Sequence, residues 1–485
     1  MKRNIFKTNS KESALKILFY LLAFITIYFI VYPISPLSDD WYYLTAPNPD
    51  FTLADLLPSN QFWRPFDALF GGLMGLVPEM FPTLNRLIVV LGHILNGALL
   101  GGVAKQIGIS PKWQMFSVCF FLFSSAVWAV TVSPDALNQT FSVLFGLLAI
   151  WLHFKYGGYY YAIFCFLALL WKESGVSWFF VVPLFDAFVR PETEGLNLKD
   201  KEKIKRFAKR IAVSLISVVA YFVVRFALLG EVALGSGDGG TYKLSLLSFS
   251  TVKNAILLLV SGATGIDSIA LFSKNRTVIL VVITFLLSAA FLLTWLFSTV
   301  SLIKQKKKTV SLICIFLCVL GLAFPLMILG SAGEMHAYPV LCGMSILLAY
   351  GFSHSHVAFK KVLISVICIF IAFGITSVHK VKSIYDYSDR TEKLTQSIME
   401  SYDRPQGSAL FVLIDDWEGY SVFEQSAAMG TYRGYSVRPY FDWVEVDHQQ
   451  NNVKSKQEAD EYITQHADEY DKVFIVEKEK AVRIK

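Results

Sequence analysis

Long apolar runs separated by short polar segments dominate the pattern of the chain. A helix needs about 20 apolar residues to cross the hydrocarbon core of a bilayer. Eleven stretches approach or meet this length, and we expect each to be a transmembrane helix: 14–33, 84–104, 113–132, 137–153, 158–171, 174–189, 209–229, 278–298, 310–329, 337–353 and 362–378. The pattern therefore predicts an α-helical polytopic membrane protein with about 11 spans.

One further stretch, 251–272 (TVKNAILLLVSGATGIDSIALF), is apolar but is interrupted by two glycines and Asp267. Basic loops favour the cytoplasmic side of a membrane. If this stretch does not cross, the basic clusters 199–210 and 304–308 share the side of the N-terminus; if it crosses, the second cluster lies outside. We therefore expect a cytoplasmic N-terminus, with 251–272 lying on the outer face or dipping into it.

This topology places two polar regions outside the cytoplasm, a first outer loop at about 34–83 and the tail 380–485. The tail contains a charged helical stretch (RTEKLTQSIMESY), two β-rich runs (SALFVLI and DKVFIVEK) and a second helical stretch (KQEADEYITQHA). We therefore divide the chain into a transmembrane domain, 1–379, and a small C-terminal extracytoplasmic α/β domain, 380–485. The expected location is the plasma (inner) membrane, as a multi-pass protein.

Composition supports the membrane assignment. Of the 485 residues, 54% are hydrophobic and 17% are charged, which is too apolar for one soluble core of this length. The formal net charge of +6 does not indicate a nucleic-acid partner, because the basic residues form short clusters between apolar runs. No P-loop, HExxH or GxSxG motif is present, so nothing in the sequence favours an ATP-driven or metalloprotease activity.

Charged side chains gather at the ends of the spans on the predicted outer face. They come from several separate segments: Asp39, Asp40, Arg64, Arg86, Asp135, Lys172, Glu173, Lys243, Glu334 and His336. A single charged residue at a span end can snorkel to the interface. Several such residues from different segments indicate a shared polar cavity that opens outward.

Four stretches occur in order on this face: SDDWYYL (38–44), FWRPFDALF (62–70), LNRLIVVLGHILNGALL (84–100) and LALLWKESGVSWFFVVPL (167–184). Over roughly the first 190 residues the chain resembles the GT-C membrane glycosyltransferases, and most nearly the protein O-mannosyltransferases. The resemblance implies a GT-C-like fold and a sugar donor linked to polyprenyl phosphate. The acceptor would be a cell-envelope glycan, lipid or protein, and membrane lipid would surround the protein.

The resemblance implies that Asp39 or Asp40 is the general base that activates the acceptor hydroxyl. The pair could also hold a divalent cation, Mg or Mn, through its carboxylate oxygens. The alternative is a solvated turn or a helix cap after the first span.

Other residues are candidates for substrate binding. The guanidinium of Arg64 could hold two phosphate oxygens, or the side chain could be an interfacial anchor. The neighbours Lys172 and Glu173 could bind the same phosphate or form a structural ion pair. Beyond residue 190 the resemblance thins: Glu334 and His336 stand before a Tyr and a Pro where such families carry an arginine, and the TPR tail of the O-mannosyltransferase relatives is absent.

Three further residues have two interpretations each. His93 and Asn96 share one helical face and could line the donor or acceptor cavity, or form an interhelical hydrogen bond. Asp135 follows a proline at the start of a span, where a carboxylate suits a helix N-terminus as well as a substrate contact.

Two other functions compete with the transferase. A transporter or flippase of lipid-linked sugars commonly has charges at the bilayer midplane and repeated halves. Here the charges lie at span ends and the sequence shows no internal repeat, which favours the transferase. The third possibility is a non-catalytic scaffold whose tail binds an envelope partner.

Overall fold

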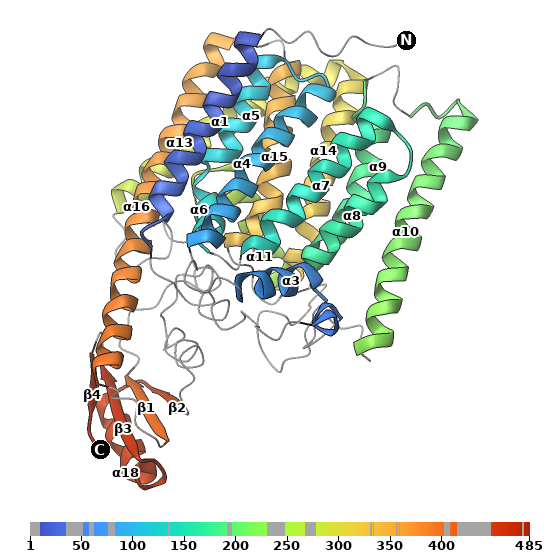
Figure 1. Cartoon of the computed structure of the whole chain (residues 1–485). Helices are drawn as coiled ribbons and strands as arrows, with labels where there is room; N and C mark the ends of the chain where they lie inside the picture. Colours follow the sequence, from blue (N-terminus) through green and yellow to red (C-terminus); the bar gives the residue numbers. More distant parts are fainter. Residues whose placement is uncertain are drawn as a thin grey trace.

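The protein is a bundle of helices joined by one long helix to a small β-sheet (Figure 1). The computed structural model describes residues 10–34, 52–57, 63–75, 83–133, 136–191, 196–229, 248–266, 278–329, 332, 334–355, 357, 359–401, 408–414, 448–477 and 480–485. The predicted residues Asp39, Asp40, Asp135 and Lys243 lie outside these ranges.

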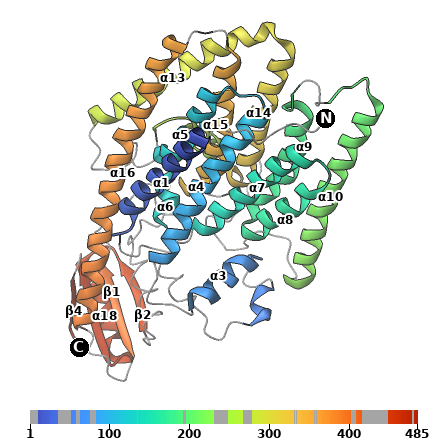
Figure 2. The same cartoon turned by 45° about the horizontal axis from the view of Figure 1, so that its top comes forward.

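The bundle consists of helices that run up and down between its two ends. They are α1 (Ser10–Val31), α4 (Thr83–Gln106), α5 (Pro111–Phe123), α6 (Trp128–Val132), α7 (Leu137–Tyr156), α8 (Tyr160–Trp171), α9 (Trp178–Phe188), α10 (Lys201–Leu229), α11 (Phe249–Ala263), α13 (Val278–Val300), α14 (Lys306–Met327), α15 (Ala337–His354) and α16 (Phe359–Ser401). The short helix α3 (Pro65–Gly75) lies across one end, which we call the α3 end (Figures 1 and 2). The N-terminal residue of α1 is at the other end, called the opposite end.

Within the described ranges, seven helices are long and apolar enough to cross a membrane, and an eighth is added if α5 and α6, which meet at a 44° bend, count as one span. These helices make the chain a polytopic helical membrane protein. The predicted spans 158–171, 174–189 and 337–353 coincide with α8, α9 and α15, of 12, 11 and 18 residues. They are shorter than the roughly 20 residues of a full crossing, so the count of eleven stays a prediction.

Helix α11 covers the first part of the ambiguous stretch and packs on α14 and α15. At its start, Asn254 Nδ2 donates to the carbonyls of Met327 and Leu329, at 3.3 and 2.8 Å. At its far end, the Gly265 amide donates to Ser288 Oγ, and its carbonyl accepts from Thr376 Oγ1 at 2.6 Å. The helix therefore enters from the α3 end and stops beside the middle of the apolar part of α16, where hydroxyl groups satisfy its last peptide groups.

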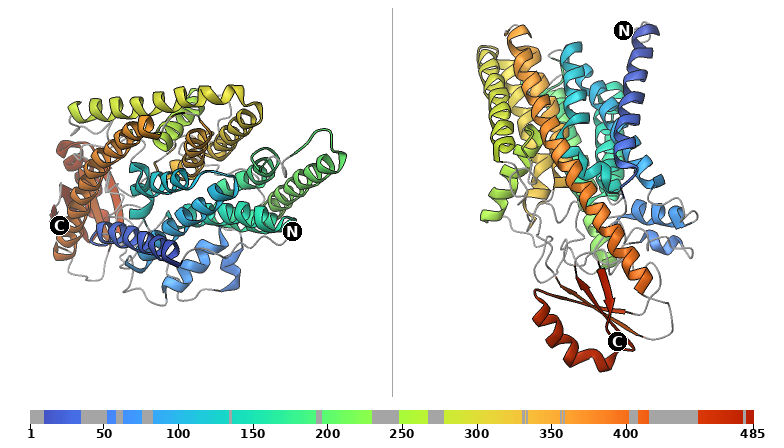
Figure 3. Two further views of the ribbon diagram at one scale, coloured as in Figure 1. Left: turned by 90° about the horizontal axis from the view of Figure 1, so that it is seen from above. Right: turned by 90° about the vertical axis from the view of Figure 1, so that its left-hand side faces the viewer.

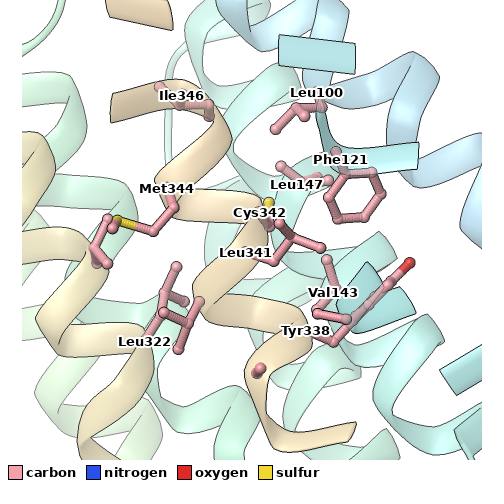
Figure 4. Packing of buried hydrophobic residues seen from close by; sticks show 14 of the residues in the cluster. Leu100, Phe121, Val143, Leu147, Leu322, Tyr338, Leu341, Cys342, Met344 and Ile346 are labelled. Atoms are coloured by element: carbon pink, nitrogen blue, oxygen red, sulfur yellow. The ribbon is translucent and has the colours of Figure 1, made fainter. Parts of the chain in front are cut away.

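Helix α15 is the core of the bundle. Every residue from Ala337 to Phe352 is buried, as expected for a helix that is apolar on all sides. Figure 4 shows Leu341, Cys342 and Met344 interdigitating with side chains of neighbouring helices. Gly343 permits close approach to α14, because a Cβ there would lie 2.9 Å from a Val319 methyl. This packed centre fixes the helices whose ends carry the site.

Helix α16 continues without a break from the bundle to the sheet (Figure 3). The predicted boundary at 379/380 falls inside it, so the charged helical stretch of the tail extends the last span. Beyond it, strands β1 (Ala409–Ile414), β2 (His448–Val453), β3 (Lys472–Glu477) and β4 (Lys480–Arg483) form a sheet of order β2-β1-β3-β4. The pairs β1–β2 and β1–β3 are parallel, and β3–β4 is antiparallel.

The predicted strands 408–414 and 471–478 and the predicted helix 456–467 are confirmed as β1, β3 and α18 (Lys456–His466). Helix α18 packs on β1 and β2. The sheet is also attached to α16, since the Ala481 amide donates to Ser397 Oγ at 2.9 Å.

Helix α10 lies at the edge of the bundle, on the side away from the sheet (Figures 1 and 3). Ion pairs hold its beginning to the opposite end of the bundle. Asp186 of α9 contacts Arg190 Nη1 at 3.0 Å and His153 Nε2 at 3.4 Å, and also binds Arg210 of α10. The last turns of α10 carry Arg225.

Candidate functional site

The α3 end carries a group of charged side chains from two segments of the chain. Arg64 and Asp67 come from the start of α3, and Lys172 and Glu173 from the break between α8 and α9. Each of these two segments therefore offers one cation and one carboxylate. Two parallel connections link them, one through Arg64 and Glu173 and the other through Asn138.

The first connection is a bidentate ion pair. Arg64 Nε lies 3.2 and 3.0 Å from the two carboxylate oxygens of Glu173, and Nη2 lies 2.8 Å from Oε2. The side chains are 19% and 10% exposed. Charge-assisted bonds of this geometry are the strong class of hydrogen bond. Of the two roles left open for the neighbours Lys172 and Glu173, the structure shows an ion pair for Glu173, and its partner there is Arg64.

The second connection runs through the amide of Asn138, at the start of α7. Lys172 Nζ donates to Asn138 Oδ1 at 3.1 Å, and Asn138 Nδ2 donates to Asp67 Oδ2 at 3.2 Å. The amide thus presents its acceptor to the cation and its donor to the carboxylate. This arrangement fixes the orientation of the amide and ties α3 to α7 and α8.

The local backbone explains why Lys172 and Glu173 point to different partners. Lys172 is extended (φ −156°, ψ 138°) after the last turn of α8, and Glu173 begins a short 3₁₀ helix, Glu173–Ser177. The turn needs Gly175, since a Cβ there would lie 2.5 Å from the Ala168 carbonyl oxygen. The sequence KESG therefore reverses the chain within one turn and spreads the two charges.

A third cation, Arg225, reaches the group from α10. It is fully buried, and its Nη1 lies 4.0 Å from Glu173 Oε1. One turn earlier, Tyr221 stacks on Trp63 with ring centroids 5.2 Å apart. The sequence analysis missed Arg225 because it lies inside an apolar run. Its spacing of four from Tyr221, on one helical face, is the signal that could have found it.

Aromatic rings stack beside the charged residues, since Trp171 precedes Lys172 and Phe66 lies between Arg64 and Asp67 in the chain. Trp171 stacks on Phe66 at 5.2 Å and on Phe141 at 4.9 Å between ring centroids. These rings come from α8, α3 and α7, the same elements that supply the charges. The charged side chains are therefore held in apolar surroundings, where electrostatic interactions are stronger than in water.

The charges act on the titration of their neighbours. Burial would raise the pKa of Glu173, but the adjacent Arg64 guanidinium, with a smaller effect of Arg225, holds that pKa below its usual value. Burial, together with the charges of Lys172 and Arg64, lowers the pKa of His336 to about 3. His336 is therefore neutral at neutral pH, so it does not replace the cation expected at its position.

His93 and Asn96 lie deeper in the bundle and are fully buried. His93 Nδ1 is 2.9 Å from Tyr338 Oη, and Asn96 Nδ2 donates to Tyr338 Oη and to the Thr140 carbonyl, both at 3.0 Å. Of the two interpretations for this pair, the structure shows the interhelical hydrogen bonds, between α4, α7 and α15. The two residues are not part of the charged group.

Arg86 has a structural role at the same end. Its side chain is 1% exposed, and its guanidinium donates to the carbonyls of Val132, at 3.0 Å, and Ile34. These are carbonyls at the ends of α6 and α1, where a cation is favourable.

Lys380 of α16 is also fully buried, with Nζ 3.4 Å from the Ser125 carbonyl.

Within the described ranges, no group of three or more His, Cys, Asp or Glu side chains could hold a metal ion. The predicted Mg or Mn ligands Asp39 and Asp40 lie outside those ranges.

Comparison with known proteins gives structural similarity only. No family model matches the chain, and no curated protein matches it. Among solved structures, the chain is similar to the oligosaccharyltransferase of Archaeoglobus fulgidus. With an acceptor peptide tethered by a disulfide bond, that structure shows 12% identity and a TM-score of 0.43, over 86% of this chain and 64% of the other.

The apo form of the same enzyme gives 12% identity and a TM-score of 0.41, covering 91% of this chain and 65% of that one. A complex with an inhibitory peptide and a dolichol-phosphate gives 11% and 0.40, covering 85% and 64%. The chain thus spans just under two thirds of the length of these proteins. With TM-scores of 0.43 and below, the likeness assigns no role to any residue of this chain.

Proposed function

We propose that this protein is an integral-membrane glycosyltransferase of the GT-C type. It transfers a sugar from a polyprenyl-phosphate-linked donor to a cell-envelope glycan, lipid or protein. The reaction takes place at the α3 end, which we assign to the extracytoplasmic face. Basic residues gather at the opposite end, on α10 and around 304–308, as the positive-inside rule expects for the cytoplasmic side.

The buried cationic group at the α3 end carries this proposal. Among the described residues, three cations, Arg64, Lys172 and Arg225, gather with two carboxylates, Asp67 and Glu173. Guanidinium and ammonium groups are the side chains that bind phosphate oxygens most favourably. The group lies where the apolar helix α8 ends and α9 is about to begin, and in this proposal that end of the bundle meets the headgroups of the membrane. A lipid phosphate therefore complements it in charge and position.

In this proposal the chemistry is divided between two parts of the α3 end. Arg64 and Lys172 bind the donor phosphate and stabilise the charge that develops on it as the glycosidic bond breaks. Asp39 or Asp40 removes the proton of the acceptor hydroxyl as that oxygen bonds to the anomeric carbon. The same aspartates could hold a divalent cation. Neutral His336 lies near the cations and could donate a hydrogen bond without adding charge.

The test is transfer of radiolabelled sugar from polyprenyl-phosphate donors by membranes containing equal amounts of wild type, Asp39→Asn, Asp40→Asn or Arg64→Ala, each with and without a chelator. We expect transfer by wild type and a loss of roughly 10²-fold or more in one aspartate variant. If a chelator abolished transfer by the wild-type protein, a metal ion would be assigned to Asp39 and Asp40. Full activity in both aspartate variants would remove the proposed base. Movement of the lipid across liposomes without any transfer would favour the transporter.

A further inference from the structure

Glu173 lies between two arginines that differ in accessibility and in distance. Arg64, with a 19% exposed side chain, binds both carboxylate oxygens at 2.8 to 3.2 Å. Arg225 is fully buried and lies 4.0 Å from Oε1, just beyond hydrogen-bonding distance. Of the two arginines, Arg64 is therefore the one accessible to a ligand. The carboxylate therefore occupies the cation that a phosphate would bind.

We propose that Glu173 is an exchangeable counter-ion of the donor site, an inference that rests on the proposed function. In this structure its carboxylate binds the guanidinium of Arg64. When a donor phosphate binds Arg64, the carboxylate moves to Arg225. Glu173 is thus a positioning residue, which acts on the donor through the arginine that it releases.

The movement required is small. Closing the separation between Arg225 Nη1 and Glu173 Oε1 from 4.0 Å to a hydrogen bond takes on the order of 1 Å. A glutamate has enough side-chain torsions to move its carboxylate this far while the backbone turn stays in place. That turn is fixed by the Gly175 amide, which donates to the Lys172 carbonyl at 2.8 Å. The exchange therefore needs no rearrangement of helices.

The second connection keeps the site assembled during the exchange. The chain of hydrogen bonds from Lys172 through Asn138 to Asp67 does not involve Glu173. It holds α3 against α7 and α8 while Arg64 changes partner. The stacked rings of Trp63 and Tyr221 also remain between α3 and α10. The carboxylate thus moves between two fixed cations.

The exchange has a kinetic consequence. Because Glu173 competes with phosphate for Arg64, it weakens donor binding. The same competition displaces the polyprenyl phosphate left after transfer, since the carboxylate returns to Arg64 as that product leaves. Removing the carboxylate should tighten the binding of both lipids and slow product release. Removing Arg225 should leave the carboxylate on Arg64 and weaken donor binding.

A double-mutant cycle tests this prediction. The variants are Glu173→Gln, Arg225→Met and their combination, and the measurements are KM and kcat for the donor and equilibrium binding of polyprenyl phosphate in detergent. We expect Glu173→Gln to lower both KM and kcat, and Arg225→Met to raise KM with kcat retained, each on the order of tenfold. The combination should have the KM of Glu173→Gln, because no carboxylate remains to be moved. Additive effects would overturn the exchange and make Arg225 a general source of positive charge.

Two further variants provide controls. Arg225→Lys keeps the charge and should restore KM relative to Arg225→Met. If Glu173→Gln does not fold, the two Arg225 variants test the exchange instead. A donor KM that is raised in Arg225→Met and restored in Arg225→Lys supports the exchange. A donor KM that is unchanged in both variants overturns it. Asp186→Asn removes a matched buried carboxylate from the opposite end of the bundle and should leave the donor KM unchanged.

The proposed function and the exchange can fail separately. A wild-type protein that neither transfers sugar nor binds polyprenyl phosphate removes the proposed function, and the exchange with it. A wild type that does both, together with an additive cycle, keeps the proposed function and removes only the exchange.

Discussion

Two buried carboxylates, one at each end of the bundle, each lie between two arginines, but they share them differently. At the opposite end, Asp186 binds Arg190 through one oxygen and Arg210 through the other. At the α3 end, both oxygens of Glu173 face Arg64, and Arg225 stays 4.0 Å away. One carboxylate thus engages both cations, whereas the other holds one tightly and lies near the second.

The difference follows from the elements that each group joins. Asp186 links α9 to the start of α10, with His153 of α7 beside it, so all its partners belong to the bundle. Glu173 links the bundle to α3, which lies across its end (Figure 2). A carboxylate that is bonded on both sides clamps helices together. One whose second cation lies just out of reach can change partner when another anion arrives.

Neutralising Asp186, which binds Arg190 and Arg210, should give the largest effect on stability. Asp186→Asn leaves Arg190 and Arg210 largely buried without their carboxylate, and breaking a buried pair in this way costs about 3–5 kcal/mol. We expect a clearly lower thermal midpoint in detergent and an unchanged donor KM in the protein that remains folded. An altered KM at full stability would contradict the assignment of this group to structure.

Removing Arg64, the arginine that Glu173 binds at the α3 end, should lower the rate of sugar transfer. Arg64→Ala removes the forked donor, and losing such a contact with transition-state charge costs on the order of 10²–10³ in rate. Arg64→Lys should recover part of this loss, because lysine keeps the charge but not the bidentate geometry. Transfer kinetics provide the measurement, and Arg190→Ala at the opposite end is the matched control. A wild-type rate in Arg64→Ala would remove the phosphate assignment.

The sequence could nominate Arg64, Lys172 and Glu173, because charged residues at the ends of apolar runs are unusual enough to mark an interface. It could not pair Arg64 with Glu173, 109 positions away, since that pairing depends on how α3 folds across the bundle. Arg225 escaped notice for a related reason. A single arginine inside an apolar run forms no local sequence pattern with its neighbours. Its role depends on the position of α10 against the bundle.

The secondary structure also divides into features that local sequence patterns predict and features that they do not. Hydropathy located the helices, and short runs rich in β-branched and aromatic residues located β1 and β3, because both patterns are local. The boundary at 379/380 was placed where polarity rises, but α16 continues to Ser401 because no Gly or Pro interrupts its helical sequence there. A change in solvent exposure does not end a helix. Backbone-breaking residues and caps do.

The turn that separates Lys172 from Glu173 provides a smaller perturbation. Gly175→Ala would place a methyl group 2.5 Å from the Ala168 carbonyl, so the turn must shift, at about 1–3 kcal/mol. We expect lower thermal stability and a raised donor KM, since both charges move with the turn. Gly321→Ala is the matched control, because the nearest atom to its new methyl would be a Val181 carbon at 3.7 Å. If the two substitutions changed thermal stability and donor KM equally, the turn at Gly175 would have no specific role in the site.

The smallest effect concerns His336, beside the cations of the α3 end. Its pKa is about 3 in the folded protein against a usual value of 6.5, so the unfolded chain takes up a proton that the folded chain refuses. The stabilisation is complete above pH 6.5 and is lost as the pH falls from 6.5 toward 3. Between pH 7 and pH 6 the change is below about 1 kcal/mol.

The measurement is the thermal midpoint of wild type and His336→Gln across this range. The variant should lose stability less steeply on acidification, because it has no proton to gain on unfolding. Parallel curves for wild type and His336→Gln would mean that neither burial nor the charges of Lys172 and Arg64 lower the pKa of His336 in the folded protein.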